Sequence, residues 1–350
     1  MDNTLTVSAS REYKIRCGGG ILESALSDFL SLMRYERILI ITDTTVDELY
    51  GAKVLNLSKH SGRECFKFAF PPGEAHKTLE TVSEILEYAA QCRLTRADLI
   101  IALGGGIVGD VGGFCAASYL RGIDFIQIPT TFLAAIDSSV GGKTGVNLAL
   151  GKNLAGAFYQ PREVICDTDF FKTLPSDIFA CGTAEAIKYG AVFDREFFDR
   201  FDGDFQNDIS DIVLKCIKFK AEVVKNDEFD RGERQLLNFG HTIGHAVEKC
   251  SSFKISHGAA VAIGMAAASR AADKLGFSKE PCGLEIMRIL EKNNLPIECP
   301  FSPDELLSAI LLDKKRAGNK LNLVLPERIG KCVLHPISLG SLHDFLKNAV

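Results

Sequence analysis

Five short apolar runs in the first half of the chain limit its possible folds more than any other feature. The runs are residues 37–42, 66–70, 99–103, 125–128 and 164–166. Each is apolar almost throughout, as is typical of strands buried on both faces of a parallel sheet. Residues 79–92, between the second and third runs, carry apolar side chains at helical spacing. Strands that alternate with helices predict a doubly wound α/β domain.

The second half of the chain has a different pattern, because the strand signal fades after about residue 178. The predicted helices there are residues 209–225, 235–249, 258–274 and 286–292. A chain of 350 residues is long enough for two domains of about 150 residues, each with its own core. We therefore expect an α/β domain over residues 1–178 and an all-α domain over residues 179–350, with the boundary within residues 173–179, after the Leu174 and Pro175 pair.

Charge and cysteine content narrow the classes of function. The net charge of −5 gives no overall attraction for nucleic acid or an anionic membrane surface. No apolar run approaches the ~18 residues of a membrane span, and residues 1–16 lack the apolar core of a signal peptide. The eleven cysteines contain no CxxC pair, which favours reduced thiols. We expect a cytoplasmic protein with a small-molecule ligand and with neither nucleic acid nor membrane as partner.

A glycine-rich loop follows the third apolar run. Gly104, Gly106 and Gly109 have the GxGxxG spacing between a predicted strand and a predicted helix. Such a loop lets a pyrophosphate approach the N–H groups of a helix N-terminus, although glycines also serve tight turns. Asp43, which ends the first run, is a candidate partner for a ribose hydroxyl or else a helix N-cap. The loop alone leaves nucleotide binding open.

A polar stripe marks the predicted helix 235–249. Arg234, Asn238, His241 and His245 fall on one narrow face if the segment is one helix. A solvated face is the common explanation, but solvent faces are usually rich in Lys and Glu rather than histidine. The glycines on either side of His241 are poor helix formers, so they indicate a close approach of backbone or ligand.

Other polar side chains add to this stripe. His257 begins a predicted helix of small residues, and Glu185 and Lys188 follow the expected domain boundary. Glu185 with two of the three histidines would form a catalytic zinc site with an open position, but spacing alone does not say which two. Lys220 shares an apolar helix face, from which it either reaches out to water or points into a pocket toward an anion.

Together these motifs resemble the 3-dehydroquinate synthase family. The matching segments are residues 72–77, 104–110, 121–122, 129–131, 137–147, 152–153, 185–188, 237–245, 257–258 and 313–315. They span most of the chain in the family's order. The resemblance implies a Rossmann-like NAD domain, a helical metal domain and a homodimer.

The resemblance also implies roles for individual residues. The zinc (or cobalt) ligands would be Glu185, His241 and His257, with His245 next to them. The NAD-binding residues would be Asp43, Glu74, Lys77, Gly105, Gly106, Asp110, Thr130 and Thr131, with Lys143, Lys152, Phe170, Thr173 and Leu174 nearby. The substrate contacts would be Asp137, Lys143, Asn153, Lys188, Lys220, Arg234, Asn238 and Lys314, with Lys315 as an alternative to the last. Arg121 resembles a family arginine that reaches into the partner subunit's site.

The implied substrate is 3-deoxy-D-arabino-heptulosonate 7-phosphate, which carries a phosphate and a carboxylate. Six cationic residues suit these two anionic groups: Lys143, Lys152, Lys188, Lys220, Arg234 and Lys314. The nearest alternative is another sugar phosphate cyclase, such as a 2-deoxy-scyllo-inosose or sedoheptulose 7-phosphate cyclase, whose substrate lacks the carboxylate. A metal-dependent NAD polyol dehydrogenase is a further alternative, and it would accumulate NADH. A non-catalytic nucleotide-binding module would lack bound zinc.

Overall fold

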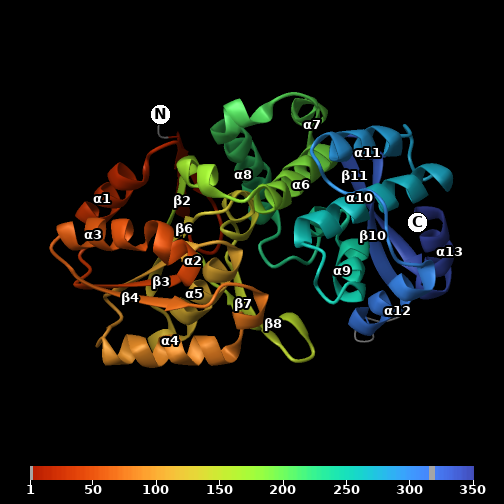
Figure 1. Ribbon diagram of the computed structural model, residues 1–350. Coiled ribbons are helices and arrows are strands. Elements are labelled where there is room, and N and C mark those ends of the chain that lie inside the picture. Colours follow the sequence, from red (N-terminus) through yellow and green to blue (C-terminus); the bar gives the residue numbers. More distant parts are fainter. Residues whose placement is uncertain (1–2, 315–319) are drawn as a thin grey trace. The chain divides into compact units, whose positions relative to one another are not determined.

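The computed structural model describes residues 3–314 and 320–350, except the side chains of residues 313, 314 and 320 (Figure 1). The chain divides into two compact units, one formed by residues 1–174 and 213–229 and the other by residues 175–212 and 230–350. The first change of unit lies four residues before the division expected from sequence. Residues 213–229 belong to the first unit, although they lie in the half that the sequence assigns to helices.

The first unit contains a seven-stranded sheet in the order β1-β2-β9-β6-β5-β3-β4. Its strands are β1 (Asn3–Val7), β2 (Tyr13–Gly18), β3 (Arg37–Asp43), β4 (Glu64–Phe70), β5 (Leu99–Gly104), β6 (Asp124–Pro129) and β9 (Glu163–Asp167). All neighbours are parallel except the edge pair β1 and β2. The five predicted strands are confirmed as β3, β4, β5, β6 and β9. The apolar pattern does not predict β1, β2 or the hairpin formed by β7 (Lys143–Leu148) and β8 (Gly151–Phe158).

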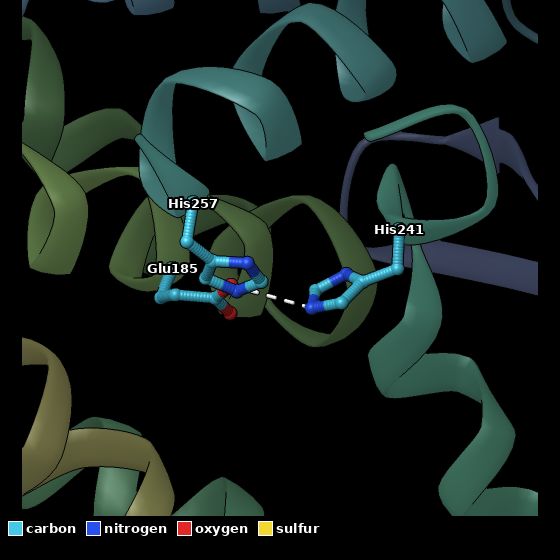
Figure 2. A group of neighbouring side chains, drawn as sticks. All are labelled: Glu185, His241 and His257. Carbon is cyan, nitrogen blue, oxygen red and sulfur yellow. Dashed lines mark ion pairs between the residues drawn. The ribbon is translucent and has the colours of Figure 1, made fainter. Parts of the chain in front are cut away.

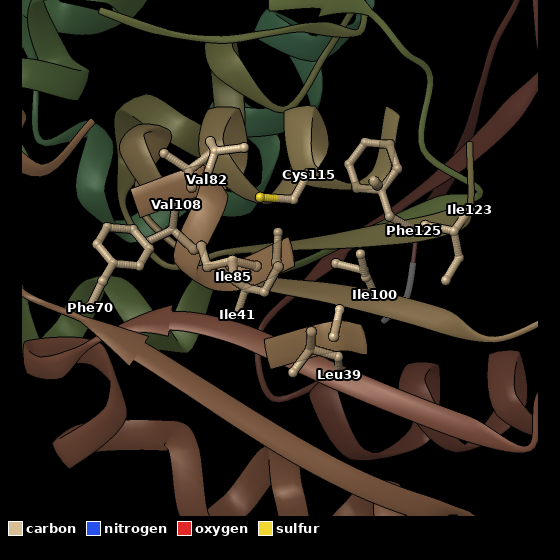
Figure 3. Close-up of a cluster of buried hydrophobic side chains, with 14 of the residues drawn as sticks. Leu39, Ile41, Phe70, Val82, Ile85, Ile100, Val108, Cys115, Ile123 and Phe125 are labelled. Atoms are coloured by element: carbon tan, nitrogen blue, oxygen red, sulfur yellow. The ribbon is translucent and has the colours of Figure 1, made fainter. Parts of the chain in front are cut away.

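Helices cover both faces of this sheet. Helices α1 (Leu22–Leu32) and α3 (Ala52–His60) lie on one side, and α4 (Leu79–Gln91) lies on the other with α5 (Gly106–Ser118) (Figure 1). The four residues from Ile38 to Ile41 are all fully buried, because alternate side chains enter opposite cores. In one core, Leu39 and Ile41 pack with Ile85 and Val108 (Figure 3). The continuous apolar runs therefore reflect a sheet with no solvated face.

The second unit is mainly helical. Its helices are α6 (Ser176–Phe193), α7 (Arg195–Asp199), α9 (His241–Cys250), α10 (His257–Lys274), α11 (Gly283–Lys292), α12 (Pro303–Lys314) and α13 (Leu339–Ala349). A two-stranded hairpin, β10 (Lys320–Arg328) with β11 (Lys331–Ser338), packs beside α6 and α10. The α/β fold with a helical second half is thus confirmed, with this small hairpin added to the helices. Helix α8 (Ile209–Asn226) supplies residues to both units.

The predicted single helix over residues 235–249 is wrong. Residues Glu233–Asn238 form a 3₁₀ helix, η8, and α9 starts afresh at His241. Gly240 between them adopts a left-handed conformation with φ +79°, which breaks the helix. Arg234 and Asn238 therefore do not continue the face of His241 and His245.

Candidate active site

The glycine-rich loop lies where the strand order of the sheet reverses. β3 and β5 are neighbours, but the chain continues from β3 outward to β4 and from β5 in the opposite direction to β6. Thr42 pairs with Leu103, so Asp43 and Gly104 are the next residues of adjacent strands. Ligands of open α/β sheets bind at such a switch point, outside the carboxyl ends of the strands. This position favours the nucleotide-binding interpretation of the loop over a simple turn.

The surroundings of the loop fit a phosphate group. A Cβ on Gly105 would lie 3.3 Å from the Thr131 side chain, and one on Gly106 would lie 3.0 Å from Ser138 Oγ. The buried hydroxyls of Thr130 and Ser138 have no hydrogen-bond partner among the described residues. A ligand with acceptor oxygens would satisfy these donors together with the N–H groups at the start of α5. The residues present therefore fit the pyrophosphate of a dinucleotide.

Lys77 is the centre of a buried polar cluster beside the loop. Its ammonium lies 2.5 Å from Asp110 Oδ2 and 2.6 Å from Asn153 Oδ1, and the residue is 5% exposed. Burial raises the pKa of Asp110, and the ion pair with Lys77 opposes that rise. Glu74, three residues before Lys77, accepts a hydrogen bond from Asn147 Nδ2 at 2.7 Å. The cluster holds the β7–β8 hairpin to the loop after β4.

A pocket of about 530 Å³ opens next to this cluster in the first unit. Its lining includes Asp110, Asp137, Lys143, Asn153 and Lys220. Lys220 is 6% exposed, and its ammonium contacts both the carboxylate and the main-chain carbonyl of Asp137. Lys220 therefore points into a pocket instead of out to water. Two cations, two carboxylates and an amide give the pocket the groups needed to bind an anionic, hydroxylated ligand.

The remaining predicted residues of the first unit are not among those that line this pocket. Asp43 caps a short helix by accepting a hydrogen bond from the Val46 N–H at 3.0 Å, and burial raises the pKa of Asp43. Phe170 and Thr173 both contact Tyr50. Arg121 lies beyond the C-terminal end of α5, about 20 Å from the glycine loop at its N-terminal end. Of the other two predicted residues, Lys152 lies in β8 and Leu174 directly follows the 3₁₀ helix that ends at Thr173.

The second unit brings together the three residues expected to bind metal. Glu185 is fully buried in α6, and His241 and His257 are the first residues of α9 and α10. Both imidazole Nε2 atoms lie 3.4 Å from Glu185 Oε1. Figure 2 shows both rings pointing toward this carboxylate. One carboxylate and two imidazoles from three helices match the ligand set of a catalytic zinc site, so the residues fit the ion.

The two histidines differ in electrostatic environment. Burial and the nearby Lys188 ammonium lower the pKa of His241 to about 3. For His257, burial works in the same direction, but hydrogen bonds to Glu185 and Glu248 outweigh it and raise the pKa to about 10. His241 Nδ1 lies 3.1 Å from the Phe239 carbonyl oxygen, so a neutral His241 that donates there presents the lone pair of Nε2 to Glu185. The two carboxylates thus favour a positive charge on His257.

Glycines bring the helices of this cluster unusually close. A Cβ on Gly244 would lie 2.9 Å from the Ala260 carbonyl oxygen, and one on Gly264 would overlap the carbonyl oxygen of Gly240. A Cβ on Gly258 would overlap the backbone of Cys181. Close helix packing therefore accounts for the glycines beside His241.

We expect Gly264→Ala to lower the free energy of unfolding by about 1–3 kcal/mol, because a methyl group forced against backbone atoms of α9 is an overpacking defect. Gly340→Ala is the matched control, since its Cβ meets nothing nearer than Ser338 Oγ at 3.8 Å. The measurement is the urea unfolding midpoint of the metal-free proteins. Equal midpoints for the two variants would contradict the close-packing explanation.

The other predicted residues of the second unit flank the cluster. Lys188 is 1% exposed and its ammonium contacts the Glu185 carboxylate. The ring of His245 is centred 5.4 Å from that of His241. Arg234 is buried and Asn238 exposed, both in η8. Lys314 and Lys315 lie outside the residues whose side chains the structure describes.

Glu248, which contacts His257, was not among the residues predicted from sequence. A signal was present, because Glu248 lies two helical turns after His241, on the same face of α9. Ser138 and Asn147 lie in the motif 137–147 but were not predicted as site residues. Ser138 lines the pocket, and Asn147 belongs to the polar cluster around Lys77.

Family models match both halves of the chain. Residues 67–181 match the model described as 3-dehydroquinate synthase N-terminal, and residues 182–316 match 3-dehydroquinate synthase C-terminal. A curated 3-dehydroquinate synthase of Clostridium acetobutylicum is 42% identical over 342 residues, covering 96% of each chain. The enzyme of Streptococcus sanguinis is 40% identical and covers 96% of this chain and 97% of its own.

Solved structures give the same fold. A 2-deoxy-scyllo-inosose synthase complexed with carbaglucose-6-phosphate, NAD⁺ and Co²⁺ has a TM-score of 0.89 at 27% identity, covering 99% of this chain and 100% of its own. A 2-epi-5-epi-valiolone synthase from Streptomyces hygroscopicus with NAD⁺ and Zn²⁺ bound has a TM-score of 0.86 at 26% identity, covering 98% of both chains. A maleylacetate reductase from Agrobacterium tumefaciens shares the fold at 17% identity, with a TM-score of 0.65 and coverage of 100% of this chain and 98% of its own.

Proposed function

Because the chain belongs to the 3-dehydroquinate synthase family, we propose that it converts 3-deoxy-D-arabino-heptulosonate 7-phosphate into 3-dehydroquinate and phosphate. The observation that carries this proposal is the match of both halves to the family, with 42% identity to a curated member over 96% of each chain. The reaction is a carbon–oxygen lyase step of the shikimate pathway, which leads to aromatic amino acids.

The reaction comprises oxidation of a hydroxyl, loss of phosphate, reduction, ring opening and an intramolecular aldol addition. The chemistry supplied by the bound cofactors is reversible hydride transfer, from NAD, and stabilisation of negative charge on a substrate oxygen, from Zn²⁺ or Co²⁺. Glu185, His241 and His257 would hold the metal. The loop of Gly105 and Gly106 would hold the pyrophosphate.

Residues of the first unit would bind and orient the substrate's anionic groups. Lys143 and Lys220 provide point charges suited to a phosphate, and Asn153 adds a neutral polar group in the same pocket. The Asp137 carboxylate holds the Lys220 ammonium in place, so the charge is oriented before substrate enters.

Residues of the second unit would act on the substrate's other groups. Arg234 suits bidentate binding of the carboxylate, with Asn238 beside it in η8. The buried Lys188 ammonium pairs with the Glu185 carboxylate, so it would orient that carboxylate beside the metal. His245 lies near the metal ligands and would move a proton between substrate and solvent.

The proposal extends to the assembly and location of the enzyme. A homodimer would give Arg121 a role in the partner's site, and its place beyond the C-terminal end of α5, at the opposite end from the glycine loop, supports this. All eleven cysteines are free thiols, which supports a cytoplasmic location. No helix among residues 3–314 and 320–350 combines the length and apolarity that a membrane span needs.

The decisive test follows phosphate and NADH together. We expect the enzyme with NAD, Zn²⁺ and the C7 acid phosphate to release one phosphate per substrate consumed without accumulating NADH, because the hydride returns within each turnover. Malachite green detects the phosphate, and the ultraviolet absorbance of the reduced nicotinamide reports NADH. Net NADH formation would instead indicate a polyol dehydrogenase.

The fold likeness to 2-deoxy-scyllo-inosose synthase makes a sugar phosphate cyclase the second candidate. Its identity to this chain is 27%, against 42% for the curated 3-dehydroquinate synthase. The same assay with glucose 6-phosphate, which lacks the carboxylate, distinguishes the two. Phosphate release from that sugar alone would favour the second candidate.

A further inference from the structure

Glu248 is a buried carboxylate to which the proposed reaction assigns no role. It lies near the end of α9 and is 4% exposed. Its backbone is firmly held, since its carbonyl oxygen accepts hydrogen bonds from Ser251 Oγ at 2.8 Å and from the Phe253 N–H at 2.7 Å. Burying a carboxylate is unfavourable unless a polar or charged partner compensates for the lost water.

One such partner is Nδ1 of His257, a histidine of the proposed metal site. Glu248 Oε2 lies 3.5 Å from His257 Nδ1, and Glu185 Oε1 lies 3.4 Å from His257 Nε2. The imidazole therefore stands between two carboxylates, each facing a different ring nitrogen. A proton held on Nδ1 toward Glu248 leaves the Nε2 lone pair directed at the site beside Glu185.

The other histidine has an equivalent arrangement with a weaker acceptor. His241 Nδ1 faces the main-chain carbonyl of Phe239 at 3.1 Å. Among the described contacts, Nδ1 of His257 faces the Glu248 carboxylate instead. A carboxylate both orients the ring and makes it a more basic ligand, whereas a carbonyl mainly orients it.

We propose that Glu248 is a positioning residue of the metal site, which fixes the tautomer and orientation of His257 and thereby strengthens metal binding. The proposal rests on the proposed function only for the identity of the metal site. Glu248 acts through His257 and does not touch substrate. The geometry also allows a different role for Glu248, as a direct metal ligand. His245, Glu248 and His257 place three ligand atoms within 4.8 Å of one another.

The test compares metal affinity in the full-length protein and in Glu248→Gln, Glu248→Ala and an exposed control on α11, Glu291→Gln. Zinc affinity is measured by competition with a chromophoric chelator, and zinc content by elemental analysis. We expect Glu248→Ala to bind zinc about 10- to 100-fold more weakly, with Glu248→Gln closer to the parent protein because the amide oxygen still accepts from Nδ1. The control should match the parent, and each loaded protein should hold one zinc per chain.

The spectrum of the Co²⁺-loaded protein separates positioning from general destabilisation. We expect the visible bands of Glu248→Ala to shift, because His257 is reoriented, while the metal-free variant unfolds near the parent's temperature. Affinities of both Glu248 variants within twofold of the parent would overturn the proposal, as would a parent with two metals per chain and a variant with one. A parent that binds one zinc but releases no phosphate from the C7 acid phosphate would contradict the proposed function while leaving this inference intact.

Discussion

Replacing His257 with alanine is expected to leave a folded protein that holds almost no metal and releases almost no phosphate. His257 supplies one of only three side chains in the proposed metal site, so its loss leaves two ligands. Loss of a residue that merely supports a ligand costs about 10- to 100-fold in affinity or activity. Loss of the ligand itself should therefore reduce turnover by more than about 100-fold.

The measurements for His257→Ala are zinc content, phosphate release and NAD affinity. NAD affinity should stay unchanged, because the glycine loop belongs to the first unit and His257 to the second. His343→Ala is the matched control, a second-unit histidine that pairs with Asp304 instead of the cluster. A His257→Ala protein that is fully active and replete with zinc would show that the ligand assignment is wrong.

Replacing Lys220 with methionine should have the second-largest effect. Methionine keeps a similar length but removes the ammonium from a pocket that is expected to bind an anion. A charge-assisted contact contributes about 1.5–3 kcal/mol. At about 1.36 kcal/mol per tenfold, kcat/KM should fall about 10- to 150-fold.

The control for Lys220→Met is Lys218→Met, an exposed lysine on the same helix. Asp137 would lose a buried cationic partner, so the unfolding midpoint should fall in Lys220→Met and recover in part when Asp137→Asn is added. Steady-state kinetics with substrate and NAD varied separately locate the defect. A kcat/KM equal to that of Lys218→Met would exclude Lys220 from substrate binding.

The parallel sheet could be predicted from sequence because its signal is local. The residues from Ile38 to Ile41 are apolar one after another, since both faces of the strand are buried. The hairpin β7–β8 was not predicted because its strands lack such a continuous apolar pattern. Gly145 and Gly156 face each other across it where a Cβ would overlap backbone, and such glycines weaken the pattern that predicts a strand.

Different parts of the candidate site could be predicted from sequence in the two units. Spacing identified the types of residue near Glu185, whereas the choice among the three histidines came from the family resemblance. Lys220 had two possible orientations on an apolar helix face, and only its contact with Asp137 distinguishes them. That contact joins residues far apart in the chain, so no local pattern could reveal it. The break at Gly240 was similarly hidden, because the atoms that crowd this position belong to Val261 and Met265 of α10, far along the chain.

The return of residues 213–229 to the first unit has a consequence for how the protein forms during synthesis. The chain passes from the first unit to the second after residue 174, back after 212, and away again after 229. Ribosomes add about 5–20 residues per second, and N-terminal domains usually fold while the rest is still being made. Here the first unit is incomplete until residue 229 has left the ribosome, because residues 213–229 belong to it and include Lys220, which lines its pocket. The surface of the first unit that residues 213–229 cover therefore stays exposed while residues 175–212, which belong to the other unit, emerge.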